Sequence, residues 1–209
     1  MAHVFCNNRD SIGGDRRSFI TGGLVALVLG LSATFAPQSV EAAGSDPFLK
    51  AKMNIAAPSG ARGLCGKYGW ACAHSGSKQA LTQADLKVVQ KINRRVNRQI
   101  RSVDDMKQYR KAEHWTLPYS NKGDCEDYAL LKKKELIRAG IAPERLLLTT
   151  VLDTRGNSHA VLVLRADTGD YVLDNLNDKI KPWKKTRYTF LRMQNPGKPG
   201  AWVGLLIKA

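Results

Sequence analysis

Acidic residues are scarce in this sequence. Its 209 residues include 18 Asp and Glu against 33 Lys and Arg, which leaves a formal net charge of +15. Such an excess favours an acidic protein partner, an anionic membrane surface or nucleic acid, and by itself it selects none of them. Hydrophobic residues make up 43% of the chain, which is enough to build a core and excludes a disordered chain. The length is typical of one domain.

Long apolar segments are also scarce. The only such run, "FITGGLVALVLGLSATFA" at 19–36, follows Arg16 and Arg17 and precedes the small residues "SVEAAGS". It is short and contains glycines, which argues against the alternative of a retained membrane anchor. The paired arginines resemble a twin-arginine export signal. We predict a signal peptide over 1–42, cleaved after Ala42, and a mature domain over 43–209 that is soluble and periplasmic and meets the membrane only through the uncleaved signal.

Cysteine is rare, and the predicted export gives each cysteine a meaning. Cys6 leaves with the signal, so the mature chain keeps Cys65, Cys72 and Cys125, an odd number in an oxidising compartment. Cys65 and Cys72 flank the glycine-containing segment "GKYGWA", which can fold back easily, and we predict that they form a disulfide. Cys125 is then the odd thiol, although a lone cysteine can also be an inert buried residue. Too few spaced Cys and His remain for a thiolate-rich zinc site.

Aromatic residues are absent from the most basic segment, "TQADLKVVQKINRRVNRQI" at 82–100. Its apolar residues recur at helical spacing, and Thr82 and Asp85 are placed as in a capping box, so we predict an amphipathic helix with a basic outer face. Readers of single-stranded nucleic acid interleave aromatic and basic residues. We therefore interpret this face as a solvated surface and predict no nucleic-acid partner.

A second helix and three strands are predicted after the loop at 113–124. The segment "DCEDYALLKKKELIRAG" begins with acids, carries its bases toward the end and stops at Gly140, as helices do. The β-rich runs at 145–153, 159–165 and 171–176 are joined by short turn-forming segments, which favours an antiparallel meander. This order predicts an α+β fold in which the helix packs on one face of an antiparallel sheet.

Cys125 lies among acids in "GDCEDY", where nearby carboxylates would disfavour a thiolate. The backbone N–H groups at a helix start favour the thiolate, and a bound cation would favour it more. His159 opens the second predicted strand and Asp174 closes the third, so antiparallel pairing makes them neighbours. Individually the two have ordinary structural explanations. Together with Cys125 they fit a Cys–His–Asp triad, in which the histidine takes the thiol proton and Asp174 fixes the tautomer.

Two stretches, "WTLPYSNKGDCEDYALLKKKELIRAGIAPERLLLTTV" and "HAVLVLRADTGDYVLDNLNDKIKPW", resemble the bacterial transglutaminase-like cysteine proteinases. The resemblance covers roughly residues 65–203. It implies a papain-like, transglutaminase-type fold with Cys125 as nucleophile, His159 as general base and then acid, and Asp174 as the residue that orients His159.

The same resemblance implies a calcium site beside the cysteine. The acids of "DCED" supply hard oxygen donors of the kind that Ca²⁺ prefers, and a further ligand is expected from the turn before the third strand. The expected ligands are Asp124, Glu126, Asp127 and Asp170. The alternative is that these acids bind no metal and that Asp124 caps the helix.

The sequence therefore predicts an exported, calcium-dependent cysteine endopeptidase. By resemblance, its substrate is a periplasmic or cell-surface protein such as a large adhesin, and an inner-membrane receptor regulates it. Two alternatives stay open: a transglutaminase or amidase that passes the acyl group to an amine, and a non-catalytic calcium-binding module.

Overall fold

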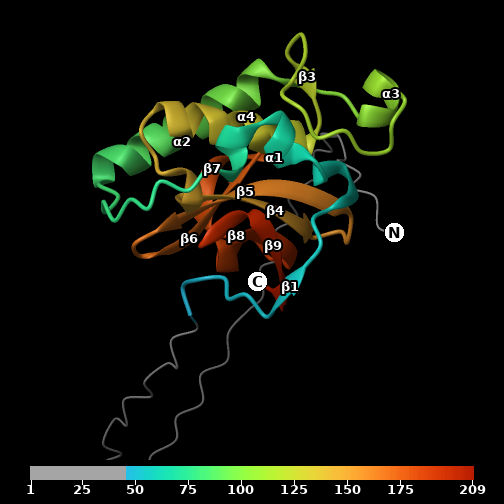
Figure 1. Ribbon diagram of the computed structural model, residues 1–209. Helices are drawn as coiled ribbons and strands as arrows, with labels where there is room; N and C mark the ends of the chain where they lie inside the picture. The colour runs from blue at the N-terminus through green and yellow to red at the C-terminus, as the bar shows by residue number, and fades with distance from the viewer. Residues whose placement is uncertain (1–45) are drawn as a thin grey trace, which may run out of the picture. The chain divides into compact units, whose positions relative to one another are not determined.

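A seven-stranded antiparallel sheet organises the computed structural model, which describes residues 46–209 (Figure 1). The predicted signal peptide over 1–42 and its cleavage site lie outside the described residues. The strand order is β1-β9-β8-β4-β5-β6-β7. In chain order, the strands are β1 (Met53–Ile55), β4 (Leu146–Leu152), β5 (Ser158–Ala166), β6 (Gly169–Asp174), β7 (Asn177–Pro182), β8 (Thr189–Asn195) and β9 (Lys198–Lys208).

The helices lie mainly on one face of this sheet, where α2 and α4 run together (Figure 1). The α-helices are α1 (Leu64–Lys67), α2 (Gln83–Gln99), α3 (Asp105–Tyr109) and α4 (Cys125–Arg138). Short 3-10 turns occupy η1 (Ser59–Ala61), η2 (Gly69–Cys72), η3 (Pro143–Arg145) and η4 (Trp183–Lys185), and β2 (Arg101–Ser102) pairs in parallel with β3 (Lys122–Gly123). Within residues 46–209, the structure contains no helix with the length and apolar character needed to span a bilayer.

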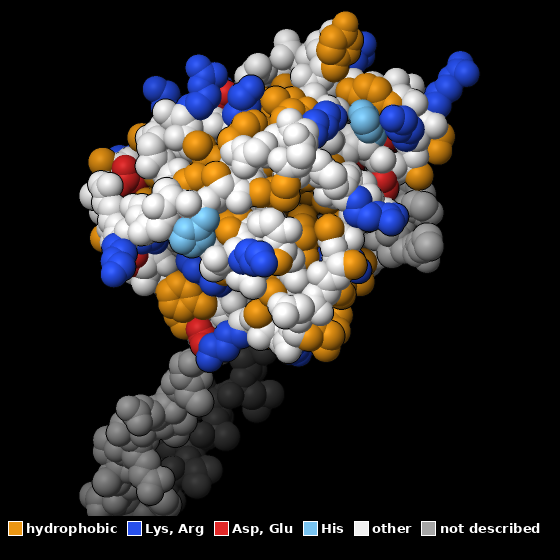
Figure 2. All heavy atoms as spheres, viewed as in Figure 1, with side chains coloured by type: hydrophobic (Ala, Val, Ile, Leu, Met, Phe, Trp, Pro, Cys, Tyr) orange, Lys and Arg blue, Asp and Glu red, His pale blue; other side chains and the backbone are white. Residues whose placement is uncertain are grey.

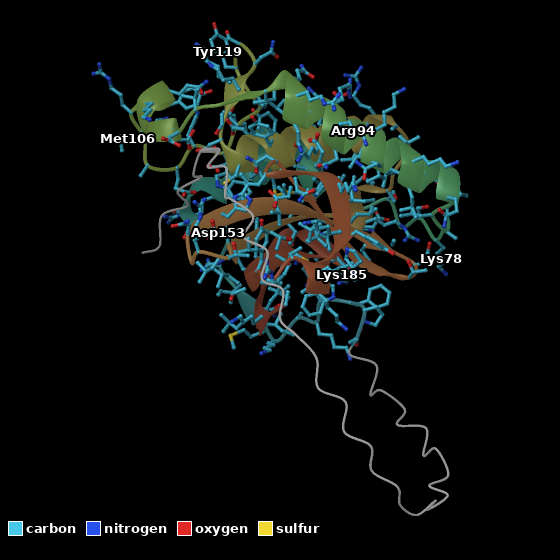
Figure 3. The ribbon with its side chains drawn as sticks, turned by 180° about the vertical axis from the view of Figure 1, so that it is seen from behind. Lys78, Arg94, Met106, Tyr119, Asp153 and Lys185 are labelled. Carbon is cyan, nitrogen blue, oxygen red and sulfur yellow. A yellow bond between two sulfur atoms is a disulfide. The ribbon has the colours of Figure 1, made fainter. Side chains whose placement is uncertain are left out.

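Helix α2 confirms the amphipathic prediction. The Thr82 hydroxyl accepts a hydrogen bond from the Asp85 N–H, and the Asp85 carboxylate accepts one from the Thr82 N–H, which completes the capping box. Its inner side chains Val89, Ile92 and Val96 are buried. Its outer face carries Lys and Arg, among them Arg94, which points away from the protein (Figure 3).

Helix α4 begins at Cys125 and ends two residues before Gly140, whose φ of +93° closes the helix as predicted. The interior of this helix differs from expectation. Lys132 and Lys133, in the run that the sequence would place near a solvated end, are both fully buried. Helix α4 therefore packs on more than one side.

The predicted meander is confirmed by β4, β5 and β6, which pair in antiparallel register. Alternate residues of β4 face opposite cores: Leu146 and Leu148 pack under the helices, and Leu147 and Val151 pack on the other face of the sheet. The second core is completed by Phe190 and other residues of the last two strands. Burial on both faces makes the central strands a rigid base for side chains at their ends.

Strands β7, β8 and β9 were not predicted. Strand β7, "NDKIKP", has no buried residue, and β9 contains Pro199 and two glycines, so neither shows the apolar alternation of a strand. Strand β7 is formed through pairing with β6, and β9 through pairing with β8, so hydrogen bonds to a neighbouring strand define them rather than their own apolar pattern. The surface bears the predicted excess of positive charge: Lys and Arg are spread over the face seen in Figure 2, where acids are few.

Candidate active site

Cys125 is the first residue of α4 and is buried. The backbone N–H of Ala160 donates to Cys125 Sγ at 3.2 Å. Because Ala160 directly follows His159 in β5, the start of that strand lies against the start of α4. A donated N–H favours negative charge on sulfur, as does the amino-terminal end of a helix.

His159 and Asp174 are neighbours, as predicted from antiparallel pairing. His159 Nε2 lies 2.9 Å from Asp174 Oδ1, and both side chains are buried. The pairing of Leu162 with Leu173 sets the register that brings them together. An ionised carboxylate only accepts hydrogen bonds, so Nε2 carries the proton and Nδ1 is the basic nitrogen.

The Asp174 carboxylate receives two further hydrogen bonds. The Tyr188 hydroxyl donates to Oδ2 at 2.6 Å, and the Leu176 N–H donates to Oδ1 at 3.0 Å. Burial alone would raise the pKa of Asp174, but the electrostatic attraction of His159 and these donors together hold it well below its ordinary value. Asp174 is thus an anion at neutral pH.

Tyr188 was missed by the sequence reasoning. It lies between η4 and β8, its ring meets the His159 ring edge-on at 6.0 Å, and burial followed by the Asp174 charge raises the pKa of its hydroxyl. It therefore stays a neutral donor. No local pattern marks this tyrosine, because its partners come from β5 and β6.

The structure confirms the Cys65–Cys72 disulfide, with a Cα–Cα distance of 5.4 Å. In the 209-residue chain Cys125 is also disulfide-bonded. The odd thiol was predicted for the mature chain from residue 43 onward, which has three cysteines, and it stays a prediction for that chain.

Three carboxylates gather beside the start of α4, from Asp105, Asp124 and Glu126. One oxygen from each lies within 4.8 Å of the others, and all three residues are buried. Asp124 occupies the N-cap position, yet its side chain makes no capping hydrogen bond. Its Oδ2 instead accepts the Asp105 N–H at 3.3 Å. Helix capping therefore does not explain this acid.

Burial dominates the electrostatics of this group. It raises the pKa of Asp124 to about 7 and that of Glu126 well above its ordinary value, and the neighbouring carboxylates add to the rise in Glu126. The pKa of Asp105 is raised by burial as well. Asp105 Oδ1 and Asp124 Oδ1 have no hydrogen-bond donor within residues 46–209. Such a cluster of oxygen atoms is suited to a hard divalent cation.

Asp105 was missed by the sequence reasoning. It opens the short helix α3, and its carboxylate accepts the His114 N–H. The acids of α4 are adjacent in sequence, whereas Asp105 reaches them from 19 residues before Asp124. Only the fold reveals the third carboxylate.

Two predicted metal ligands lie outside this group. Asp127 Oδ1 accepts the Thr116 N–H at 3.0 Å, and burial with the nearby Asp124 raises the Asp127 pKa to about 9. Asp170 accepts two hydrogen bonds from Arg165, at 3.0 and 2.8 Å. Arg165 lies six residues beyond His159 along β5, which is about 20 Å in a strand. The structure therefore does not bring Asp170 together with the acids of α4, because Asp170 pairs with an arginine at the far end of the strand.

Comparison with known proteins adds a separate finding. The sequence profile of the family described as "bacterial transglutaminase-like cysteine proteinase" matches residues 51–208. The structure of calcium-bound LapG from Legionella pneumophila matches with a TM-score of 0.50 and 22% identity, over 59% of this chain and 71% of that one.

Two further LapG structures from the same organism match with lower scores. One has a TM-score of 0.48 and 22% identity, over 57% of this chain and 68% of that one. The other, EGTA-treated, has a TM-score of 0.47 and 23% identity, over 53% and 63%. Among curated proteins no match is found. The match to calcium-bound LapG confirms the predicted fold class.

Proposed function

This chain belongs to the bacterial transglutaminase-like cysteine proteinase family, and from that premise we propose that it cleaves a protein substrate with a triad of Cys125, His159 and Asp174. The observation that carries the proposal is the 2.9 Å contact between His159 Nε2 and Asp174 Oδ1, beside a strand N–H that touches Cys125 Sγ. A base with a fixed tautomer next to a sulfur is the arrangement that nucleophilic catalysis requires.

The reaction follows from these positions. His159 takes the Cys125 proton, and the thiolate attacks the carbonyl carbon of the scissile peptide bond to form a C–S bond. The carbon–nitrogen bond then breaks, and the amine leaves with the proton from His159. Water, deprotonated by His159, attacks the thioester, releases the acid and restores the thiol. Backbone N–H groups at the start of α4 are the proposed oxyanion donors.

A calcium site at Asp105, Asp124 and Glu126 forms the second part of the proposal. The residues fit the ion, because three buried carboxylates converge within 4.8 Å and Asp105 Oδ1 and Asp124 Oδ1 accept no hydrogen bond within residues 46–209. Bound calcium would supply the positive charge that offsets the acids next to Cys125. The matching LapG structure is a calcium-bound one, which supports the proposal. Asp127 holds the Thr116 backbone and supports the cluster from outside.

We also propose that the protein is exported and acts on a periplasmic or cell-surface protein. The support is the twin-arginine-like segment ahead of residue 42 and the disulfide between Cys65 and Cys72. By family resemblance, the substrate is a large adhesin and an inner-membrane receptor regulates the enzyme.

Comparative proteomics of the cell surface tests this function. Cells that produce the wild type should release fragments of one surface protein, and cells with Cys125→Ala should retain it whole. Equal release by both strains contradicts the proposal. Purified protein incubated with that substrate and a labelled amine separates hydrolysis from acyl transfer, because amine incorporation without chain cleavage identifies a transglutaminase.

A further inference from the structure

We propose that Tyr68 is a positioning residue for the start of the catalytic helix α4. It lies in the loop closed by the Cys65–Cys72 disulfide, and it acts through Thr116 on Asp127, in the first turn of α4. This inference rests on the proposed triad and adds a residue that the reaction itself does not use. It also gives the disulfide a role at the active site.

The disulfide closes a short loop, and Tyr68 lies in it between α1 and η2. The backbone of Tyr68 is bonded to both ends of this loop: its N–H donates to the Leu64 carbonyl at 2.7 Å, and its own carbonyl accepts the Ala71 N–H at 2.8 Å. Gln194 of β8 donates from Nε2 to the Ala71 carbonyl at 3.1 Å, which attaches the loop to the sheet. The Tyr68 side chain therefore extends from a fixed backbone.

The Tyr68 hydroxyl is bonded to two consecutive residues of the segment that leads to β3. It lies 3.1 Å from Thr116 Oγ1, and it accepts the Leu117 N–H at 3.2 Å. Lys67, the preceding residue of the loop, donates from Nζ to the same Thr116 Oγ1 at 2.9 Å. Two neighbouring side chains of one loop thus fix the position of Thr116.

The Thr116 backbone in turn contacts the first turn of α4. Its N–H donates to Asp127 Oδ1 at 3.0 Å, and Asp127 is fully buried. The same carboxylate lies against Gly123, so closely that a Cβ atom at position 123 would lie 2.5 Å from Asp127 Oδ2. Only glycine permits this approach. Asp127 is therefore held between Thr116 and the backbone that leads into Cys125.

The same segment also reaches the proposed calcium cluster, because the His114 N–H donates to the Asp105 carboxylate. The segment thus donates to one acid of the cluster and to one acid in the first turn of α4. Its displacement would move the start of α4 relative to β5, whose backbone N–H contacts Cys125 Sγ. Tyr68 therefore helps to align Cys125 with His159.

The test measures the rate at which iodoacetamide alkylates Cys125 in the purified chain. Every protein carries Cys6→Ser, which leaves Cys125 as the odd cysteine beside the disulfide, so the measurement needs no reductant. Tyr68→Phe removes the hydroxyl and keeps the ring, whose centre lies 5.5 Å from that of Trp70. We expect about fivefold slower alkylation in a folded protein, a size typical of mutations along a packed network.

A second background separates positioning from packing. If Tyr68 aligns Cys125 with His159, Tyr68→Phe should have no further effect in a His159→Ala protein, because the base is then missing. A hydroxyl that only supported the fold would change the alkylation rate to the same extent in both backgrounds.

Tyr171→Phe is the matched control. The Tyr171 hydroxyl is also bonded to a threonine hydroxyl, that of Thr168, with 3.3 Å between the two oxygens. Tyr171 pairs with Leu164, at the opposite end of β5 from His159, so this contact lies away from the start of α4. Tyr171→Phe should leave the alkylation rate unchanged.

Thr116→Val provides a second variant in case Tyr68→Phe does not fold. It removes Oγ1 and keeps the N–H that donates to Asp127. It should also slow alkylation, and the double variant should fall short of the product of the two single effects, because both remove one contact. Replacing Cys65 and Cys72 by serine should slow alkylation too, and Tyr68→Phe should add less in that background than in the bridged protein.

An unchanged rate in folded Tyr68→Phe, or an equal change in Tyr171→Phe, overturns the inference, as does an undiminished effect of Tyr68→Phe in the His159→Ala background. A full additional effect of Tyr68→Phe in the protein without the disulfide overturns the role of the disulfide. If His159→Ala by itself leaves the alkylation rate unchanged, the triad is overturned, which is a different result.

Discussion

Buried carboxylates lie near both the strand and the helix that meet at Cys125, and the pKa values of the two sets are shifted in opposite directions. Asp174, on the strand side, receives three hydrogen bonds and is attracted by His159, and its pKa is lowered. Asp124 and Glu126, on the helix side, face one another and Asp105, and their pKa values are raised. Burial acts in the same direction on both groups. The number of hydrogen-bond donors and the sign of the neighbouring charges therefore decide whether the pKa rises or falls.

The comparison separates two kinds of role. A carboxylate that the protein itself satisfies is fixed as an anion and can orient a histidine. Carboxylates that converge on one another in a buried site need a proton or a cation from outside. The same kind of side chain thus has a permanent role at Asp174, and at Asp124 and Glu126 it has a role that depends on a bound proton or cation.

We expect the largest effect from removing the charge of Asp174, the carboxylate that receives three hydrogen bonds. Asp174→Asn should lower turnover by about 10³-fold or more, because the amide no longer fixes the His159 tautomer. Cleavage of the identified substrate measures this effect, and circular dichroism checks the fold. His159→Ala should abolish turnover in a folded protein. Wild-type rates in either variant contradict the triad.

On the helix side, Glu126→Gln should remove calcium binding in titration calorimetry, together with most activity. One anionic ligand of three is lost, while the length of the side chain is kept. The melting temperature in chelator should barely move, since the site is then without its cation in both proteins. Asp170→Asn is the matched control and should keep calcium binding, because Asp170 pairs with Arg165. Chelation should inactivate the wild type, and calcium but not magnesium should restore it.

Tyr188→Phe removes one of the three hydrogen-bond donors to the Asp174 carboxylate and leaves two. The loss of a hydrogen bond to a charged group is worth roughly 1.5–3 kcal/mol, so turnover should fall by about ten- to a hundredfold, less than in Asp174→Asn. The apparent pKa for activity on the acidic side should rise, because Asp174 is then easier to protonate. Turnover equal to that of Asp174→Asn would show that Tyr188 holds the fold instead.

The smallest effect is on stability against pH in chelator. Asp127 has a folded pKa of about 9 and an unfolded value near 3.8, so the folded state binds more protons between these limits. Stability should be greatest near the lower limit and should fall as the pH rises through 9. Thermal melts in chelator between pH 5 and 9 measure the slope, and Asp127→Asn should flatten it by a few degrees per pH unit. An unchanged slope in that variant would show that Asp127 is ionised in the fold.

Elements with a local pattern could be predicted from the sequence. The capping box and apolar spacing of α2, the acids and Gly140 that bound α4, and the three apolar runs of the meander all act within a few residues of one another. The contact of His159 with Asp174 followed from antiparallel geometry alone, and the Cys65–Cys72 bridge from a seven-residue separation.

Features that depend on distant contacts could not be predicted. Asp105 joins the acids across a loop, and Tyr188 reaches Asp174 from the segment between η4 and β8. The buried lysines of α4 look like a solvated run, because what covers them comes from elsewhere in the chain. Resemblance assigned Asp170 to the metal site, and the pairing of β5 with β6 explains why it lies far away.

The end of the sheet at β9 has a practical consequence for handling the protein. Strand β9 has eleven residues, and within residues 46–209 its outer edge is paired with β1 only at Trp202, Val203 and Gly204. Beyond that point Leu206 is 59% exposed. A partly open, apolar edge can pair with a second chain, which risks aggregation. Leu206→Lys should therefore improve solubility at high concentration. An affinity tag fused after Ala209 would lengthen this unpaired apolar edge.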